Sequence, residues 1–426
     1  MKRIAILNGR VIDPASGLDQ VANVYLAKSH IAAVGTAPEG FVADDTIDAA
    51  GKWVIPGLVD LSARLGEPGG EQKKMLQSEL GAAVAGGVTT VCALPDTDPA
   101  LDEPSLVRTL RDRADAIGLA RVLPVGALTR KLKGEELAEL AELRDAGCVA
   151  FSQADAPISD LRVLLRAMQY AATFGLTLRL RPQDASLAAG GVAHDGEVAT
   201  RLGLPGIPVM AETTAISNIV ILMRDTGARV HLERVSSAEG LEMVRAARSY
   251  GLPLSCDVSI HHVQLSDVDI GFFDSNARMN PPLRSLRDRD AISEALLDGT
   301  VSAICSDHTP VGKDAKLLPF GEATPGASAL EVLLTQVLAW GERQHIEPAR
   351  ALRTITSEPA ALLGFKDRGT LSAGSIADVV IFDPAIEWRP GAATLKSRSK
   401  HTPFADTAQR GKVVTTIVGG KVAFRG

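Results

Sequence analysis

The stretch GLVDLSARLGEPGG, residues 57–70, places Ser62 and Arg64 two positions apart on an expected strand. Alternate side chains of a strand point the same way, so these two face the same space. Two histidines at this spacing would supply half of a metal site. An arginine stays protonated in proteins and cannot ligate a metal. The stretch therefore has the spacing of a metal-binding strand without its ligands.

Other residues capable of chemistry lie beside later apolar runs. Asp307 and His308, in SDHTP, are the best candidates for acid–base chemistry, although they need an activated water to act on. The HH pair at 261–262 follows an apolar run and favours packing over ligation. His231 and Glu233 share one face of an expected strand, opposite to Arg234, and we expect that face to meet a helix layer.

Composition excludes several functional classes. The chain has 426 residues, a net charge of −6, 46% hydrophobic and 23% charged residues, so no basic field indicates nucleic-acid binding. No apolar run is long enough for a membrane span or a signal peptide, which predicts a cytoplasmic protein. The four cysteines lie far apart without a CxxC pair, and we expect them to be reduced residues of the core. Phosphate-binding and serine-nucleophile motifs are missing.

From residue 56 the chain alternates strand-like and helix-like segments, which is typical of a parallel α/β fold. Eight apolar β runs favour a closed (β/α)8 TIM barrel; they are LVDLSAR, GVTTVCALP, RVLPVGAL, CVAFS, LTLRLRP, ARVHLERVSS, LPLSCDVSI and VSAICSD. Both ends of the chain consist of strands and turns. We therefore predict a barrel, residues 56–366, inserted in a small composite β domain built from residues 1–55 and 367–426.

Several motifs together resemble the amidohydrolase superfamily and, within it, the zinc-dependent bacterial dihydroorotases. The motifs are PGLVD (56–60), EPG (67–69), GGVTTV (86–91), LPDTDP (94–99), VAFS (149–152), SLAAGG (186–191), AE (211–212), HLERVSS (231–237), HH (261–262), MNPPLR (279–284) and SDHTP (306–310). The resemblance runs nearly from end to end. It implies a barrel whose metal and substrate are held at the ends of the strands.

The resemblance also locates the positions at which this chain departs from the family. Metal-ligand positions carry other residues, and so do the positions of the arginine and asparagine that bind substrate. The replaced positions are Ser62, Arg64, Gly66, Asp96, Gln153, Ala154, Arg181, Arg234 and Val311. Vestiges of the family pattern remain at Asp307, His308 and Asn280.

These replacements predict a site without metal. A catalytic zinc normally has three protein ligands, and one aspartate, Asp307, cannot replace them. Three of the replacements are arginines, which repel a dication. A buried Asp307 without a partner would cost about 3–5 kcal/mol, so we expect Arg64, Arg181 or Arg234 to pair with it. No cofactor is expected.

The resemblance therefore implies a non-catalytic dihydroorotase-like protein, a pseudoenzyme of pyrimidine biosynthesis. Such proteins scaffold the catalytic chain of aspartate carbamoyltransferase, which is the expected partner, and a homodimer is the expected state. One alternative is an active cyclic amidohydrolase with a rebuilt, metal-independent site at Asp307 and His308. Another is a sensor in which the three arginines hold a phosphate or carboxylate.

Overall fold

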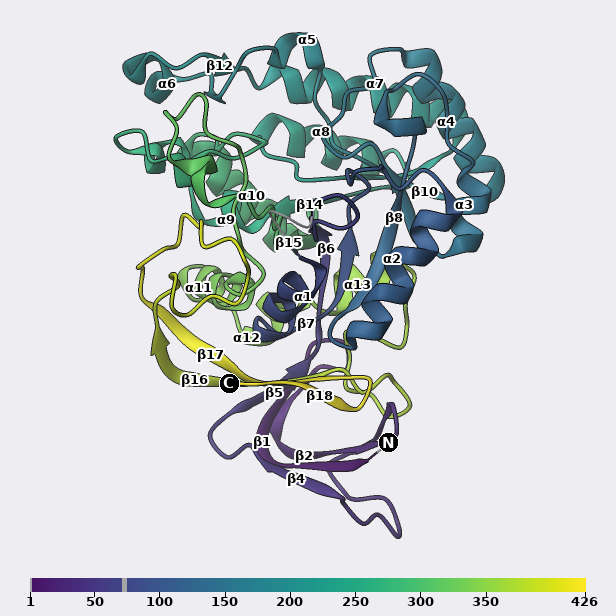
Figure 1. Cartoon of the computed structure of the whole chain (residues 1–426), viewed down its shortest axis with the longest axis vertical. Helices are drawn as coiled ribbons and strands as arrows, with labels where there is room; N and C mark the ends of the chain where they lie inside the picture. Colours follow the sequence, from purple (N-terminus) through teal and green to yellow (C-terminus); the bar gives the residue numbers. More distant parts are fainter. Residues whose placement is uncertain (1, 71–74) are drawn as a thin grey trace.

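Eight parallel strands form a nearly closed barrel at the centre of the molecule (Figure 1). The computed structural model describes residues 2–70 and 75–426. The barrel strands follow one another in chain order: β6 (Leu58–Ala63), β7 (Val88–Ala93), β8 (Arg121–Ala127), β9 (Ala150–Ser152), β10 (Thr177–Leu180), β13 (Arg229–Leu232), β14 (Leu254–Ser259) and β15 (Ala303–Cys305). A parallel bridge between Ala63 and His308 joins the two edges. Each strand lies within one of the eight predicted runs, which confirms the barrel.

Helices surround the barrel and cover the outer faces of its strands. The longer helices are α1 (Leu76–Ala85), α2 (Pro104–Ile117), α3 (Leu140–Ala146), α4 (Leu161–Phe174), α7 (Met210–Thr226), α8 (Ala238–Ser249), α10 (Leu286–Asp298) and α11 (Leu333–Arg343). Short helices and one small strand pair lie in the connections: η1 (Arg130–Leu132), α5 (Ala185–Ala188), β11 (Ala193–His194), α6 (Glu197–Leu202), β12 (Gly206–Ile207), α9 (Ile260–Gln264), η2 (Asp267–Ile270), η3 (Ser275–Ala277), η4 (Lys313–Lys316), α12 (Pro348–Arg353) and α13 (Ser357–Leu362). Among the described residues, no helix combines the length and apolar character that crossing a membrane requires.

The local sequence explains the helices, as α4 shows. The Asp160 carboxylate caps the first turn by accepting a hydrogen bond from the amide of Arg162 at 2.8 Å. Gly175 ends the helix in the left-handed conformation at φ 65°. The buried side chains of α4 follow the helical period: Leu164, Ala167, Met168 and Ala171.

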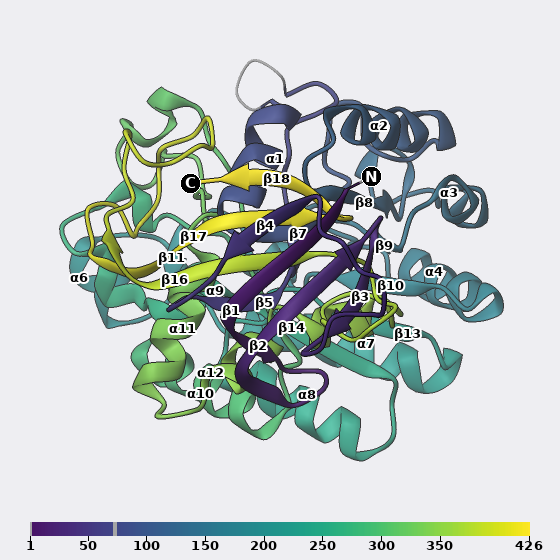
Figure 2. The ribbon, with the colours of Figure 1, turned by 90° about the horizontal axis from the view of Figure 1, so that it is seen from below.

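Both ends of the chain combine in a second sheet, which lies below the barrel in Figure 1 and in front of it in the view from below (Figure 2). Its strands are β1 (Arg3–Asp13), β2 (Leu18–Ala27), β3 (His30–Val34), β4 (Asp45–Asp48), β5 (Trp53–Pro56), β16 (Val379–Trp388), β17 (Gln409–Val418) and β18 (Lys421–Arg425). Antiparallel pairing of β5 with β16 joins the N-terminal strands to the C-terminal ones. The composite β domain is therefore confirmed, while the boundaries at residues 55 and 367 stay predictions.

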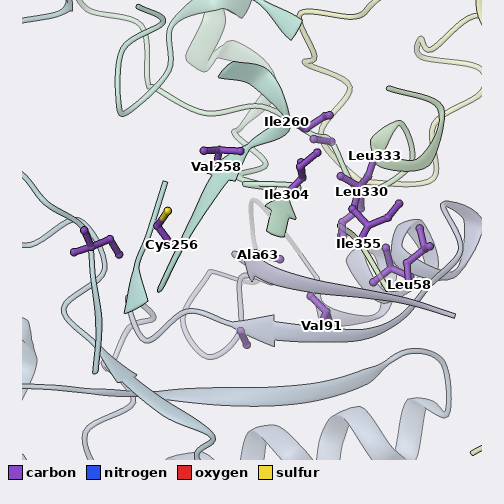
Figure 3. Packing of buried hydrophobic residues seen from close by; sticks show 14 of the residues in the cluster. Leu58, Ala63, Val91, Cys256, Val258, Ile260, Ile304, Leu330, Leu333 and Ile355 are labelled. Atoms are coloured by element: carbon purple, nitrogen blue, oxygen red, sulfur yellow. The ribbon is translucent and has the colours of Figure 1, made fainter. Parts of the chain in front are cut away.

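The main core lies between the barrel strands and the helices around them (Figure 3). A smaller apolar layer fills the barrel itself: Leu61, Cys92, Val125, Ala150, Ala303 and Cys305. All four cysteines are buried and unpaired, as the sequence predicted for core residues. Burial raises the pKa of Cys92 to about 12, so its thiol stays protonated at neutral pH.

Candidate functional site

The carboxyl ends of the barrel strands bring half of the predicted site residues together at one mouth of the barrel. Arg64 follows β6, Arg181 follows β10, Arg234 follows β13 and Asp307 follows β15. Parallel strands end on the same side, which is where barrel enzymes build their active sites. The predicted residues that meet there are Arg64, Asp96, Arg181, Arg234, Asn280 and Asp307.

Arg234 and Asp307 form the ion pair that the sequence predicted. Nη1 of Arg234 donates to Oδ1 of Asp307 at 3.0 Å, and the two side chains are 0% and 6% exposed. Burial raises the pKa of the Asp307 carboxyl, and the Arg234 and Arg64 guanidiniums oppose that rise. Of the three arginines considered, Arg234 is the one in direct contact with Asp307.

Asp155, in the loop after β9, is the centre of the arginine cluster, and the sequence analysis missed it. Arg234 Nη2 donates to Asp155 Oδ1 at 2.7 Å, and Arg64 Nη2 donates to Oδ2 at 2.7 Å. Arg181 Nε lies 3.4 Å from Oδ1. Burial acts to raise the pKa of Asp155, but the three guanidiniums prevail and hold it well below its usual range.

Arg64 and Arg181 also donate hydrogen bonds to groups other than Asp155. Arg64 Nε donates to Asp96 Oδ2 at 2.6 Å, and Nη1 donates to Thr309 Oγ1 at 2.8 Å. Arg181 Nη2 donates to Asn280 Oδ1 at 2.6 Å and also reaches Gln183. Burial lowers the pKa of Arg181 to about 10, so this guanidinium still carries its charge at pH 7.

Charge balance is the signal that could have revealed Asp155. Three arginines converge at one mouth of the barrel, and buried charges normally need partners of opposite sign. Asp307 alone leaves two guanidiniums uncompensated. Asp96 and Asp155 complete three carboxylates for three guanidiniums, and Asp155 is an acid two residues after the replaced position Gln153.

Five of the replaced positions, Ser62, Gly66, Gln153, Ala154 and Val311, form no side-chain hydrogen bond or ion pair with this cluster among the described residues. Ser62 is buried, and its hydroxyl has no hydrogen-bond partner within the described chain. Gln153 turns to Thr129, at 2.8 and 3.0 Å. Gly66 has a φ of 85° and precedes the turn at residues 67–69, and Val311 is a buried apolar residue. None of these side chains carries a charge.

His308 was the best acid–base candidate, but both of its ring nitrogens contact buried groups of the protein. Its Nε2 lies 2.9 Å from Glu79 Oε2 in α1, and both side chains are fully buried. Its Nδ1 accepts the amide hydrogen of Ala329 at 3.1 Å. Because an amide can only donate, Nδ1 is an acceptor and the ring proton resides on Nε2, facing Glu79. The ring thus links the strand end to helix α1.

His231 and Glu233 correct the prediction that their strand face meets the helix layer. Both point into the barrel: His231 Nε2 lies 2.9 Å from Asp257 Oδ2, and Glu233 Oε1 lies 2.8 Å from Arg179 Nη2. Glu233 also accepts a hydrogen bond from Ser152 at 2.9 Å. A buried polar network therefore lies inside the barrel, beneath the mouth.

Left-handed backbone at the strand ends explains why the alternation argument failed. Arg234 has a φ of 55°, Ala154 a φ of 50° and Asp307 a φ of 50°. At such a residue the chain leaves the strand geometry, so the side chain no longer points opposite to its neighbour. Arg234 can then reach the mouth although Glu233, next to it, faces the barrel interior.

The histidine pair favoured for packing is indeed packed. Nε2 of His262 lies 3.0 Å from the carbonyl oxygen of Pro282. His261 stacks on Phe404 with 5.7 Å between ring centroids, and within the described chain its nitrogens have no hydrogen-bond partner. Burial lowers the pKa of His261 to about 3 and that of His262 to about 4, so both rings are neutral at pH 7.

The donor set at the mouth does not fit the zinc that the family resemblance implies. Zinc needs three or four Cys, His or carboxylate ligands gathered within bonding distance. Over residues 2–70 and 75–426, no group of three or more such side chains is placed to hold a metal ion. The carboxylates Asp155 and Asp307 are held by guanidiniums, which repel a dication.

Arg64→Ala is expected to lower the free energy of unfolding by about 1–3 kcal/mol. The substitution takes a charged donor from Asp96, Asp155 and Thr309, and the two carboxylates are only partly exposed. Urea unfolding measures the loss.

Arg162→Ala is the matched control. Arg162 also pairs with a carboxylate, but its side chain is 85% exposed and the pair is screened by solvent, so no measurable change in the free energy of unfolding is expected. Equal effects of the two substitutions would contradict a stabilising role for the arginine cluster.

Comparison with known proteins gives consistent similarities over the whole chain. The family model described as dihydro-orotase-like matches residues 51–240. A dihydroorotase-like protein of Pseudomonas putida is 43% identical over 419 residues, covering 98% of each chain. A dihydroorotase of Syntrophotalea carbinolica is 41% identical over 99% of each chain.

A solved structure gives the same fold. The L-hydantoinase of Arthrobacter aurescens superimposes with a TM-score of 0.88 at 25% identity, covering 100% of this chain and 97% of the hydantoinase. The superposition includes both the barrel and the sheet formed by the termini, because essentially the whole of each chain is covered.

Proposed function

The chain belongs to the dihydroorotase-like family of the amidohydrolase superfamily, and on that basis we propose that it is a non-catalytic member of the family. Its role is to support another enzyme of pyrimidine biosynthesis. The observation that carries the proposal is the cluster at the mouth of the barrel, where three guanidiniums and three carboxylates neutralise one another. Side chains of this kind cannot supply the metal-activated water of the family reaction.

The proposed partner is the catalytic chain of aspartate carbamoyltransferase. This choice comes from the family resemblance, in which barrels with replaced ligands serve as scaffolds for that enzyme. The arginine–aspartate cluster is compatible with such a role because it preserves the barrel without a metal. A homodimer is proposed as the supporting unit on the same basis.

An active cyclic amidohydrolase with a metal-independent site is the alternative. It would use Asp307 and His308 as its acid–base pair. The geometry disfavours this alternative, because Asp307 is held by Arg234 and both nitrogens of His308 are engaged inside the protein. The reaction would need another group to activate water or the substrate.

Metal content and dihydroorotate hydrolysis, measured on the same preparation, test the proposal. The protein is purified without chelator and assayed with and without added zinc. We expect zinc far below one equivalent per chain and no hydrolysis above the buffer rate in either assay. Stoichiometric zinc with turnover would overturn the non-catalytic proposal, and turnover without metal would favour the alternative.

The partner proposal needs a separate measurement. Purified chain and purified aspartate carbamoyltransferase catalytic chain are mixed and followed by size-exclusion chromatography with light scattering. A stable complex is the expected result. If no complex forms, the proposed scaffold role is wrong. The proposed lack of catalysis is tested separately by the hydrolysis assay.

A further inference from the structure

A cavity of about 470 Å³ lies at the end of the barrel opposite to the arginine cluster. It is lined by residues at the start of β10, β13 and β14, namely Thr177, Arg229 and Ser255, and by the end of α13. Cavities of about 300–1,000 Å³ are the size that small-molecule ligands occupy. None of the residues of the arginine cluster lines this cavity.

Arg179 lines the inner part of this cavity, and its guanidinium has buried donors without an acceptor. It is 2% exposed, and its Nε and Nη1 have no acceptor within the described chain. Nη2 lies 2.8 Å from Glu233 and 3.7 Å from Asp257. Two carboxylates already face one guanidinium, so a second anion is disfavoured there. The unused donors call for a neutral acceptor such as a carbonyl oxygen.

The rim of the cavity is positive instead. Arg229 is exposed, and the described residues provide it with no ion pair. Arg144, also on the rim, has Asp145 as its partner at 2.8 Å, but this pair is largely exposed and leaves guanidinium donors available. An anionic group at the rim would therefore meet two guanidiniums opposed by one carboxylate.

Apolar side chains connect the inner part with the rim. Leu61, Phe151, Leu176 and Leu362 line the same cavity as Arg179 and the two rim arginines. Such walls accept a flat or aliphatic body and exclude a second charge. The three zones thus differ in chemistry along one cavity.

We propose that this cavity binds a small, flat organic anion. A neutral carbonyl oxygen of the ligand accepts from Arg179, its ring lies against the apolar walls, and its carboxylate or phosphate contacts Arg229 and Arg144. The site is separate from the mouth of the barrel. It does not depend on whether the chain is catalytic.

Isothermal titration with 4-acetylbenzoate tests the proposal, because this probe carries a carbonyl and a carboxylate at opposite ends of a ring. Benzoate lacks the carbonyl and acetophenone lacks the anion. We expect saturable binding of 4-acetylbenzoate and at least tenfold weaker binding of the other two. Equal affinity for benzoate, or no binding of 4-acetylbenzoate, would overturn the assignment.

Three variants locate the binding site. Arg229→Glu reverses the rim charge and is expected to weaken binding about tenfold, while Arg201→Glu, an exposed arginine on α6, is the matched control and leaves it unchanged. Ala361→Trp places a large ring at the exposed rim and is expected to abolish binding. Unchanged binding in folded Ala361→Trp, verified by its circular dichroism and Tm, would overturn the proposal.

Discussion

Arg234→Met is expected to lower the free energy of unfolding by about 3–5 kcal/mol, a larger loss than any other single change in the cluster. Arg234 is fully buried and donates to both Asp307 and Asp155. Its removal leaves Asp307, itself 6% exposed, as a buried carboxylate without its direct partner. Urea unfolding at pH 7, followed by fluorescence and circular dichroism together, gives the difference.

The double variant Arg234→Met/Asp307→Asn separates the effect of an unpaired charge on stability from the effect of the lost arginine side-chain volume. An amide in place of the carboxylate no longer carries the charge that the guanidinium neutralised, so the double variant is expected to recover a large part of the lost stability. Asp307→Asn alone leaves Arg234 with Asp155 as a partner and is expected to cost less than Arg234→Met. A loss below about 1 kcal/mol for Arg234→Met would show that this ion pair does not stabilise the barrel.

The sequence was sufficient to predict most of the fold because its physical signals are local. Continuous apolar runs of the buried strands alternate with helical periods, and each predicted run contains one barrel strand. The strand-rich termini predicted the composite sheet, which β5 and β16 complete. Eight strand–helix units that close a parallel sheet form a (β/α)8 barrel.

The candidate site was predictable in its residues and less so in its contacts. An arginine partner for Asp307 followed from the requirement that a buried charge has a partner, and the structure identifies Arg234 as that arginine. The role of Asp155 could not be predicted, because this residue lies in a loop and hydrophobic periodicity does not determine the path of a loop. The predicted direction of the His231 and Glu233 side chains was wrong, because it was inferred from Arg234. Arg234 has a left-handed backbone conformation, so strand alternation does not extend to it.

The cluster gives a common physical account of Arg64, Arg181 and Arg234. A single arginine at this mouth of the barrel would be an unpaired cation in a buried space. The three guanidiniums instead share Asp96, Asp155 and Asp307, so the set balances only as a whole. Asp155 contacts all three guanidiniums, which makes it the group on which the balance depends.

Asp155→Ala is therefore expected to convert the mouth of the barrel into an anion-binding site. The substitution frees donors of Arg64, Arg181 and Arg234 that now surround one carboxylate. Inorganic phosphate has the charge and the acceptor geometry that such guanidiniums bind. Titration calorimetry should show saturable phosphate binding by the variant and at least tenfold weaker binding by the parent chain.

The same variant has an expected pH signature. The folded-state pKa of Asp155 lies below its unfolded value of about 3.9, so its contribution to stability is present above that value and is lost as the pH falls. Because Asp155 is 30% exposed, its removal should cost about 1–3 kcal/mol at pH 7, less than a fully buried partner. The difference in the free energy of unfolding between parent and variant should narrow as the pH falls below about 4.

Asp290→Ala, at an exposed carboxylate paired with Arg289, is the control: it should change neither stability nor phosphate binding. Phosphate at 100 times its Kd should return about 2.7 kcal/mol to Asp155→Ala and nothing to the control, because only a ligand of the folded state stabilises it. If Asp155→Ala gained no phosphate affinity and lost no stability, the guanidiniums would have to find their balance in Asp96 and Asp307 alone. The assignment of Asp155 as the internal anion of the cluster would then fail.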